Sequence, residues 1–156
     1  MNRTYTIYFI VLLLILCRFT HVSAEEKVEL LYGRYNADEF WEAKNCHGGP
    51  GSLWLQVLLK DENFQSNINF FSVGRLAPGS GIGEHIHRNT EEMFFIFNAP
   101  AEFTVNGNTS LLPAGSCVLC PMGSSHGLYN SSNVTLEWLD IAVTREKGEF
   151  DAIDFG

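Results

Sequence analysis

Four side chains that could share one metal ion lie in two short segments of the chain: His85, His87, Glu92 and His126. In a β-strand, residues two apart point to the same face, so the spacing predicts that His85 and His87 project together. His126 follows Pro121 and Gly123, which predict a turn between two short strands that carries His126 back beside the pair. The pattern therefore predicts a sheet structure in which three imidazoles and one carboxylate meet.

Short apolar runs separated by turn residues continue along the chain from residue 52. They cover residues 53–59, 68–76, 93–97, 101–105, 117–120, 127–129 and 134–143. Their length, their content of Phe, Val, Ile and Leu, and the Asn106-Gly107 pair typical of a hairpin turn favour an all-β sandwich or barrel over alternating βα units. The sequence contains no internal repeat, so we expect a single barrel unit.

The two segments resemble the two sequence motifs of the cupin superfamily. The fixed positions of the first motif are occupied by Gly79, His85, His87 and Glu92, and its final glycine is replaced by Ala99. The second motif is complete, with Gly115, Pro121, Gly123, His126 and Asn130. The resemblance covers roughly residues 66–144. It implies an all-β fold, the double-stranded β-helix or cupin jelly-roll barrel, in a small single-domain metal-binding cupin.

The one departure from the motifs lies in the expected hairpin Asn98-Ala99-Pro100. A tight hairpin turn usually needs a residue that tolerates a positive φ. We expect Asn98 to adopt that conformation in place of the missing glycine.

The resemblance implies a metal site made of His85, His87, Glu92 and His126. Glu91 is the alternative carboxylate, because both acids follow His87 at a spacing that the family permits. We favour Glu92, since apolar residues begin directly after it. Nitrogen and oxygen ligands of this kind suit one divalent transition metal: Mn, Cu, Zn, Fe or Ni. Ferrous iron oxidises readily outside the cell, so Mn, Cu or Zn fit an extracellular protein better.

Residues 1–24 have the form of a cleaved secretion signal. Arg3 is followed by an apolar run at residues 7–17, and small residues at Val22-Ser23-Ala24 suit cleavage after Ala24. The rival interpretation is a membrane anchor, but this run is shorter than the ~20 residues that a membrane-spanning helix needs. We therefore expect a secreted, extracellular protein.

Three further segments follow the signal. We expect an N-terminal arm at 25–51 with a short strand at 28–32 or a helical turn at 37–43 capped near Asn36, the cupin barrel at 52–144, and an acidic tail at 145–156 that packs across the barrel or frays. Cleavage removes two basic residues and no acid, so the formal charge moves from −8 to −10. This charge disfavours nucleic acid as a partner.

The mature chain keeps three cysteines, and Cys117 and Cys120 are too far apart in one strand to bridge each other. Any internal disulfide then uses Cys46, and Cys46–Cys117 is the pairing that we favour in an oxidising compartment. Asn108, Asn130 and Asn133 begin glycosylation acceptor sequences in a eukaryotic source. Asn108 and Asn133 are the favoured sites, because the motif role of Asn130 should occupy its side chain.

The proposed ligands favour a metal-dependent oxidoreductase, similar to a dioxygenase, that acts on a small organic substrate, with Glu92 shifting to accept a proton. A non-catalytic cupin that binds a small ligand, and a metal-dependent isomerase or decarboxylase, are the alternatives. Arg75 could meet an anionic substrate only if its strand points it into the barrel. The resemblance also implies a homodimer, and no membrane contact is expected after signal cleavage.

Overall fold

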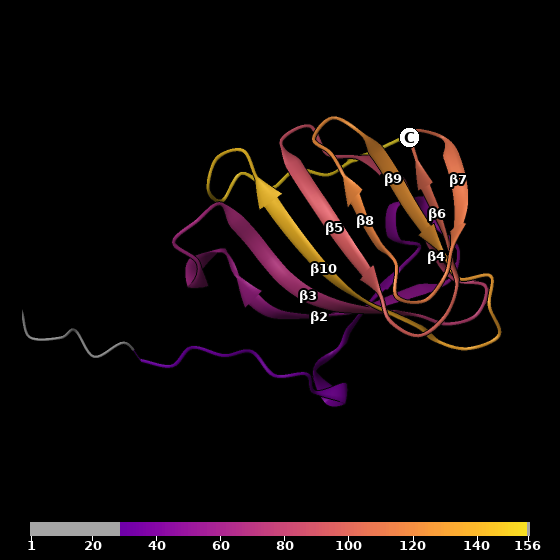
Figure 1. The fold of residues 1–156 in the computed structure, drawn as a ribbon, viewed down its shortest axis with the longest axis horizontal. Helices are drawn as coiled ribbons and strands as arrows, with labels where there is room; N and C mark the ends of the chain where they lie inside the picture. The colour runs from indigo at the N-terminus through magenta and orange to yellow at the C-terminus, as the bar shows by residue number, and fades with distance from the viewer. Residues whose placement is uncertain (1–28, 156) are drawn as a thin grey trace, which may run out of the picture. The chain divides into compact units, whose positions relative to one another are not determined.

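Residues 29–155 are described by the computed structural model, and from Leu31 onward they form one unit (Figure 1). Within this part of the chain the strands are β1 (Trp41–Lys44), β2 (Ser52–Lys60), β3 (Ile68–Leu76), β4 (Gly81–Ile86), β5 (Thr90–Ile96), β6 (Ala101–Val105), β7 (Asn108–Leu112), β8 (Cys117–Cys120), β9 (Ser125–Tyr129), β10 (Leu136–Thr144) and β11 (Ile153–Asp154). Three short 3₁₀ helices complete the set: η1 (Ala37–Glu39), η2 (Cys46–Gly48) and η3 (Asp61–Asn63). The all-β prediction is confirmed.

Two sheets enclose the core. One sheet has the strand order β1-β2-β3-β10-β5-β8 and the other has the order β11-β4-β9-β6-β7, and all strand pairs are antiparallel. Alternate residues of β10 are buried, which places Leu136 and Trp138 inside. They pack in one cluster with Phe94 of β5 and with Phe103 and Leu128 of the opposite sheet. The core therefore lies between the two sheets. A polar residue on the inner face of one sheet points toward the opposite sheet.

The predicted hairpin at Asn106-Gly107 joins β6 and β7. The φ angles of Asn106 and Gly107 are 48° and 72°, the positive values that a tight hairpin of this handedness requires. The expectation for Asn98 is wrong, because Asn98 is not among the described residues with positive φ. Its side chain instead donates to the Thr135 carbonyl at 2.9 Å and accepts from the Glu137 amide at 2.9 Å, which fixes the turn by side-chain bonding.

The N-terminal arm differs from the prediction in two elements. Residues 29–32 form no strand, whereas the arm adds β1 to the edge of the six-stranded sheet. Of the helical turn expected at 37–43, only Ala37–Glu39 is helical, as η1, because β1 begins at Trp41; Asn36 caps η1 by accepting from the Asp38 amide at 3.2 Å. The predicted secretion signal and its cleavage site lie outside the described residues. Among residues 29–155 there is no helix with the length and apolarity needed to span a membrane.

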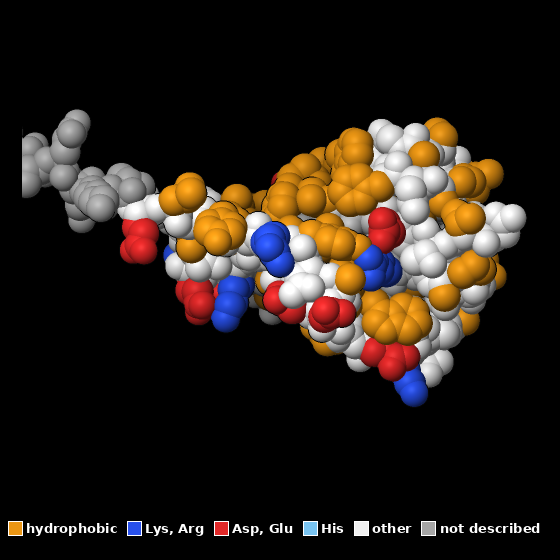
Figure 2. Space-filling view, turned by 90° about the horizontal axis from the view of Figure 1, so that it is seen from below, with side chains coloured by type: hydrophobic (Ala, Val, Ile, Leu, Met, Phe, Trp, Pro, Cys, Tyr) orange, Lys and Arg blue, Asp and Glu red, His pale blue; other side chains and the backbone are white. Residues whose placement is uncertain are grey.

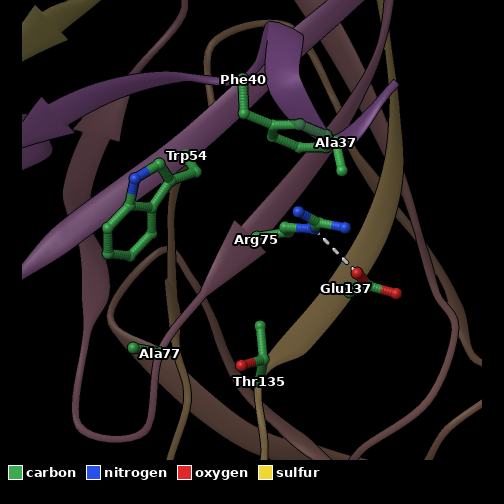
Figure 3. Close-up of a pocket in the computed structure, with 7 residues that line it drawn as sticks. All are labelled: Ala37, Phe40, Trp54, Arg75, Ala77, Thr135 and Glu137. Carbon is green, nitrogen blue, oxygen red and sulfur yellow. Dashed lines mark hydrogen bonds and ion pairs between the residues drawn. The ribbon is translucent and has the colours of Figure 1, made fainter. Parts of the chain in front are cut away.

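Arg75 lies on the outer face of the six-stranded sheet. Its Nε donates to Glu137 Oε1 at 2.8 Å, and its guanidinium group stacks on Phe40 at 4.3 Å from the ring centroid (Figure 3). The hollow beside it is lined by Ala37, Phe40, Trp54, Arg75, Ala77, Thr135 and Glu137. Arg75 is thus engaged outside the barrel, and the substrate role considered for it is not supported.

The face drawn in Figure 2 shows Lys and Arg side chains that stand singly, close to acidic ones, among hydrophobic patches. This face carries no basic stripe of the kind that binds a phosphate backbone.

Candidate metal centre

Three strands and one loop residue bring the four predicted ligands to one point. His85 lies in β4 directly opposite His126 of β9, His87 follows the end of β4, and Glu92 lies in β5 of the other sheet. Their candidate ligand atoms all lie within 4.8 Å of one another, and each side chain is buried. Glu91, the alternative carboxylate, lies outside this cluster, since its neighbour Glu92 takes the inward face of β5.

The atoms that face the cluster centre fit a cation. Glu92 places its two oxygens 3.7 Å from His87 Nε2 and 3.1 Å from His126 Nε2. Despite these distances, neither Nε2 atom makes an aligned hydrogen bond with any group in residues 29–155. Buried nitrogen atoms normally have a partner. A divalent ion between the rings and the carboxylate would supply one.

Burial sets the protonation of the cluster. It lowers the pKa of His85 to about 3, with the neighbouring His126 adding to the effect, and it lowers the pKa of His126 to about 4. Both rings are therefore neutral at physiological pH and keep a lone pair for a metal. Burial also raises the pKa of Glu92 to about 7, which the nearby His87 opposes. Only an added positive charge would hold that carboxyl fully ionised.

The C-terminal tail fixes the ring of His87. Nδ1 of His87 donates to the backbone carbonyl of Asp151, which leaves Nε2 for the metal. The Asp151 carboxylate in turn accepts from the Arg88 amide at 2.7 Å, the Asn89 amide at 3.0 Å and Thr90 Oγ1 at 3.0 Å. These bonds lower the pKa of Asp151 below its usual range. The described part of the tail, residues 145–155, therefore packs against the barrel at Asp151.

The N-terminal arm covers His85. The His47 ring stacks on the His85 ring with centroids 3.7 Å apart and an interplanar angle of 11°, while His47 Nδ1 donates to Asp154 Oδ1 at 2.5 Å. His85 Nδ1 donates to the Gly83 carbonyl at 2.9 Å, so its Nε2 also remains for the metal. Gly83 permits this stacking, because a Cβ there would overlap the carbonyl of His47. We call the His47–Asp154 and Asp151 contacts the terminal clamps.

Comparison with known proteins agrees with this geometry. The family model described as "Cupin domain" matches residues 72–142. The "Oxalate-binding protein" of Thermotoga maritima is 30% identical to the chain over 99 residues, which span 64% of this chain and 82% of that protein. The chain belongs to the cupin family.

Two solved structures place this cupin among its relatives. One is the crystal structure of a predicted oxalate decarboxylase from Thermotoga maritima, with a TM-score of 0.70, 27% identity and coverage of 73% of this chain and 99% of that one. The other is a Cupin 2 conserved barrel domain protein from Salinispora arenicola, with a TM-score of 0.58, 21% identity and coverage of 74% and 88%. The second shows the likeness of fold alone.

The ligands of this cupin open onto a cavity of ≈ 330 Å³ between the sheets. Besides the four ligands, its walls are formed by Trp41, Cys46, His47, Leu53, Leu55, Val57, Asn69, Phe70, Ile82, Phe94, Trp138, Asp140 and Phe150. Sequence reasoning missed His47, Asp140, Phe150 and Asp151. Only Asp140 had a usable signal, because the alternation of β10 places it on the same inward face as Trp138.

The expected Cys46–Cys117 disulfide is absent, since all three cysteines in the described part of this cupin are free. Cys117 is exposed on β8, whereas Cys46 packs against the core and borders the cavity, so the two lie on different sides of the sheet.

Asn130 is fully buried and bonded, donating to the Leu76 and Val134 carbonyls at 2.8 Å each. Asn108 and Asn133 are exposed, and glycosylation there stays a prediction.

Proposed function

We propose that this cupin is a metal-dependent oxidoreductase that acts on a small carboxylic acid bound at a divalent transition ion. The observation that carries the proposal is the placement of the four ligands on the wall of the ≈ 330 Å³ cavity. Four protein ligands on an ion that prefers six leave two positions for other molecules. A small carboxylate can fill them from the cavity.

The cavity favours a small and partly apolar organic molecule. Leucine, valine and phenylalanine side chains make up much of its wall, and the volume lies at the lower end of the range for ligand pockets. The oxalate-binding relative and the predicted oxalate decarboxylase of the same organism support an organic acid as the ligand. An ion bound here would supply positive charge that lowers the pKa of a bound acid or water.

The chain's own groups have separate roles in this proposal. His85, His87 and His126 would hold the ion through ring nitrogens. Glu92 would complete the set and, by shifting away from the ion, would accept a proton from a bound substrate. Phe150 lines the cavity beside His87, with its ring centroid 5.2 Å from the imidazole, and adds apolar surface for the ligand.

A second candidate is a cupin that binds a small acid without changing it. The name of the oxalate-binding relative favours this function. A metal-dependent isomerase or decarboxylase is the other alternative, and the likeness to the predicted oxalate decarboxylase supports decarboxylation. Secretion, cleavage after Ala24 and assembly into a homodimer remain predictions.

One experiment separates these functions. Protein loaded in turn with Mn, Cu, Zn, Fe or Ni is titrated with oxalate by calorimetry, and the same samples are followed for oxygen uptake and carbon dioxide release. The oxidoreductase proposal expects metal-dependent binding with oxygen consumption, whereas a binding protein shows heat without turnover. Metal-free protein is the control, and no acid binding with any of the five ions would overturn both functions.

A further inference from the structure

Asp140 is a buried acid on the inner face of the six-stranded sheet. The alternation of β10 points it between the sheets, where it pairs across the strands with Ser72 of β3 and Phe94 of β5. Asp140 is 7% exposed and Ser72 is 0% exposed. Neither residue is a member of the metal cluster.

Three polar atoms of this region lack hydrogen-bond partners among the described residues: Asp140 Oδ1, Ser72 Oγ and Trp138 Nε1. Buried polar groups without partners destabilise a folded protein, so an unpaired group inside a barrel needs an explanation. Replacing such a group by an apolar one of similar size is commonly neutral or stabilising. A ligand that completes the missing hydrogen bonds explains why an acid occupies this position.

Asp140 and Trp138 border the same cavity as the four metal ligands. Burial raises the pKa of Asp140 well above its usual range, and the nearby Glu92 adds to the effect. In its protonated form this carboxyl can donate a hydrogen bond, as the Trp138 N–H does. Much of the remaining wall is apolar, and Asn69 and His47 are its other polar side chains outside the four ligands.

We propose that Asp140, assisted by the Trp138 N–H, recognises an oxygen acceptor at the end of the bound acid that is remote from the metal. The inference rests on the proposed function, because it requires the first carboxylate of the ligand to lie at the ion. It names the substrate class more narrowly as a small acid with a second carboxylate or carbonyl group. A monocarboxylic acid of equal length leaves the donors of Asp140 and Trp138 unpaired and binds more weakly.

The test compares two pairs of acids that differ only in the second carboxylate: malonate with propionate, and succinate with butyrate. Calorimetry on metal-loaded protein gives the affinity ratio of each pair for the wild type, Asp140→Leu and Asp140→Asn. Glu137→Gln, on the outer face of the same strand, is the control. Metal content and the melting temperature of the ligand-free protein are measured for every variant.

We expect the wild type to prefer at least one diacid over its monoacid partner by about tenfold or more, as for a hydrogen bond to a charged group. Asp140→Leu should abolish that preference while its metal content is unchanged and its melting temperature is equal or higher. Asp140→Asn keeps an N–H donor and should retain the preference to within about threefold. Glu137→Gln should behave as the wild type does.

Two failures are distinguishable. If the acids bind but Asp140→Leu keeps the wild-type ratio, the inference is wrong and the proposed function stands. If no acid binds the metal-loaded wild type, both are overturned. Should Asp140→Leu fail to fold, the wild-type ratios decide, since equal affinities for diacid and monoacid contradict the inference.

Discussion

The two sheets of the barrel contribute unequal halves of the site. The side of the five-stranded sheet supplies three imidazoles, and the terminal clamps fix the rings of two of them by contacts with His47, Asp151 and Asp154. The six-stranded sheet supplies Glu92 and Asp140 from regular strands, and Asp140 Oδ1 has no partner among the described residues. The nitrogen half is thus positioned by outer contacts, whereas burial sets the charge of the carboxyl half.

Loss of one imidazole ligand should have the largest effect on metal affinity. His126→Ala removes a neutral donor from the centre of the cluster, and we expect metal affinity to fall by more than about 100-fold, beyond the roughly 10–100-fold typical of an outer contact. Metal retained after dialysis against a graded chelator, measured by elemental analysis, checks this. Glu91→Gln alters an acid beside the cluster and should retain metal, and equal retention by both variants would contradict the site.

Loss of the contact between the C-terminal tail and His87 should have the next largest effect on metal affinity. Asp151→Ala removes three hydrogen bonds to residues 88–90 and frees the carbonyl that accepts from His87. We expect metal affinity to fall toward the upper part of the ~10–100-fold range, because the His87 ring loses its fixed orientation. Chelator competition measures the change. Glu149→Ala, at a nearby exposed acid of the same tail, should leave the affinity unchanged, and a matching loss there would point to a general effect of charge.

The clamp on His85 should act through the stacking of His47. Gly83→Ala forces the His47 backbone away from β4, and His47→Ala removes the stacked ring directly. We expect each variant to weaken metal binding toward the lower end of the same ~10–100-fold range. The double variant should be no weaker than either single one, because both remove one contact. Full additivity in a double-mutant cycle would show that the glycine acts independently of His47.

The strands that carry the metal ligands are predictable because the spacing of the ligands within each short segment indicates which face they share. His85 and His87 share a face by strand periodicity, and the turn at Pro121 and Gly123 returns His126 to them. The clamps are not predictable in the same way, since Asp151 meets His87 across 64 positions of sequence through a backbone carbonyl, which no side-chain pattern reveals. For the acidic tail, the sequence predicts only that it packs or frays.

Two predictions, the Cys46–Cys117 disulfide and the positive φ of Asn98, are wrong because contacts between distant parts of the chain decide the outcome. The Cys46–Cys117 pairing fails because Cys117 is exposed on β8, whereas the partly buried Cys46 borders the cavity. The positive φ expected for Asn98 from its place in a turn is not needed, because two side-chain hydrogen bonds, to Thr135 and Glu137, hold the turn without it. The inward orientation of Asp140 can be predicted, because Asp140 lies between the buried residues Trp138 and Ala142 in the alternating pattern of β10.

The charge of the carboxyl half can be tested through the pH dependence of metal binding. Burial raises the pKa of Glu92 to about 7, so below neutral pH a metal must displace a proton from that carboxyl. His85 and His126, with pKa values lowered to about 3 and about 4, stay neutral and do not compete down to about pH 5. Acidification from pH 7 to 5 should then weaken metal binding, by up to about tenfold per pH unit through Glu92.

Glu92→Gln separates the two halves in this measurement. The amide cannot titrate, so we expect weaker metal binding at pH 7 and little further loss between pH 7 and 5. Asp151→Ala leaves Glu92 in place and should shift the whole curve to weaker affinity while its slope is kept. A slope retained in Glu92→Gln would assign the proton to an imidazole, and the nitrogen half would then be the part of the site that responds to pH.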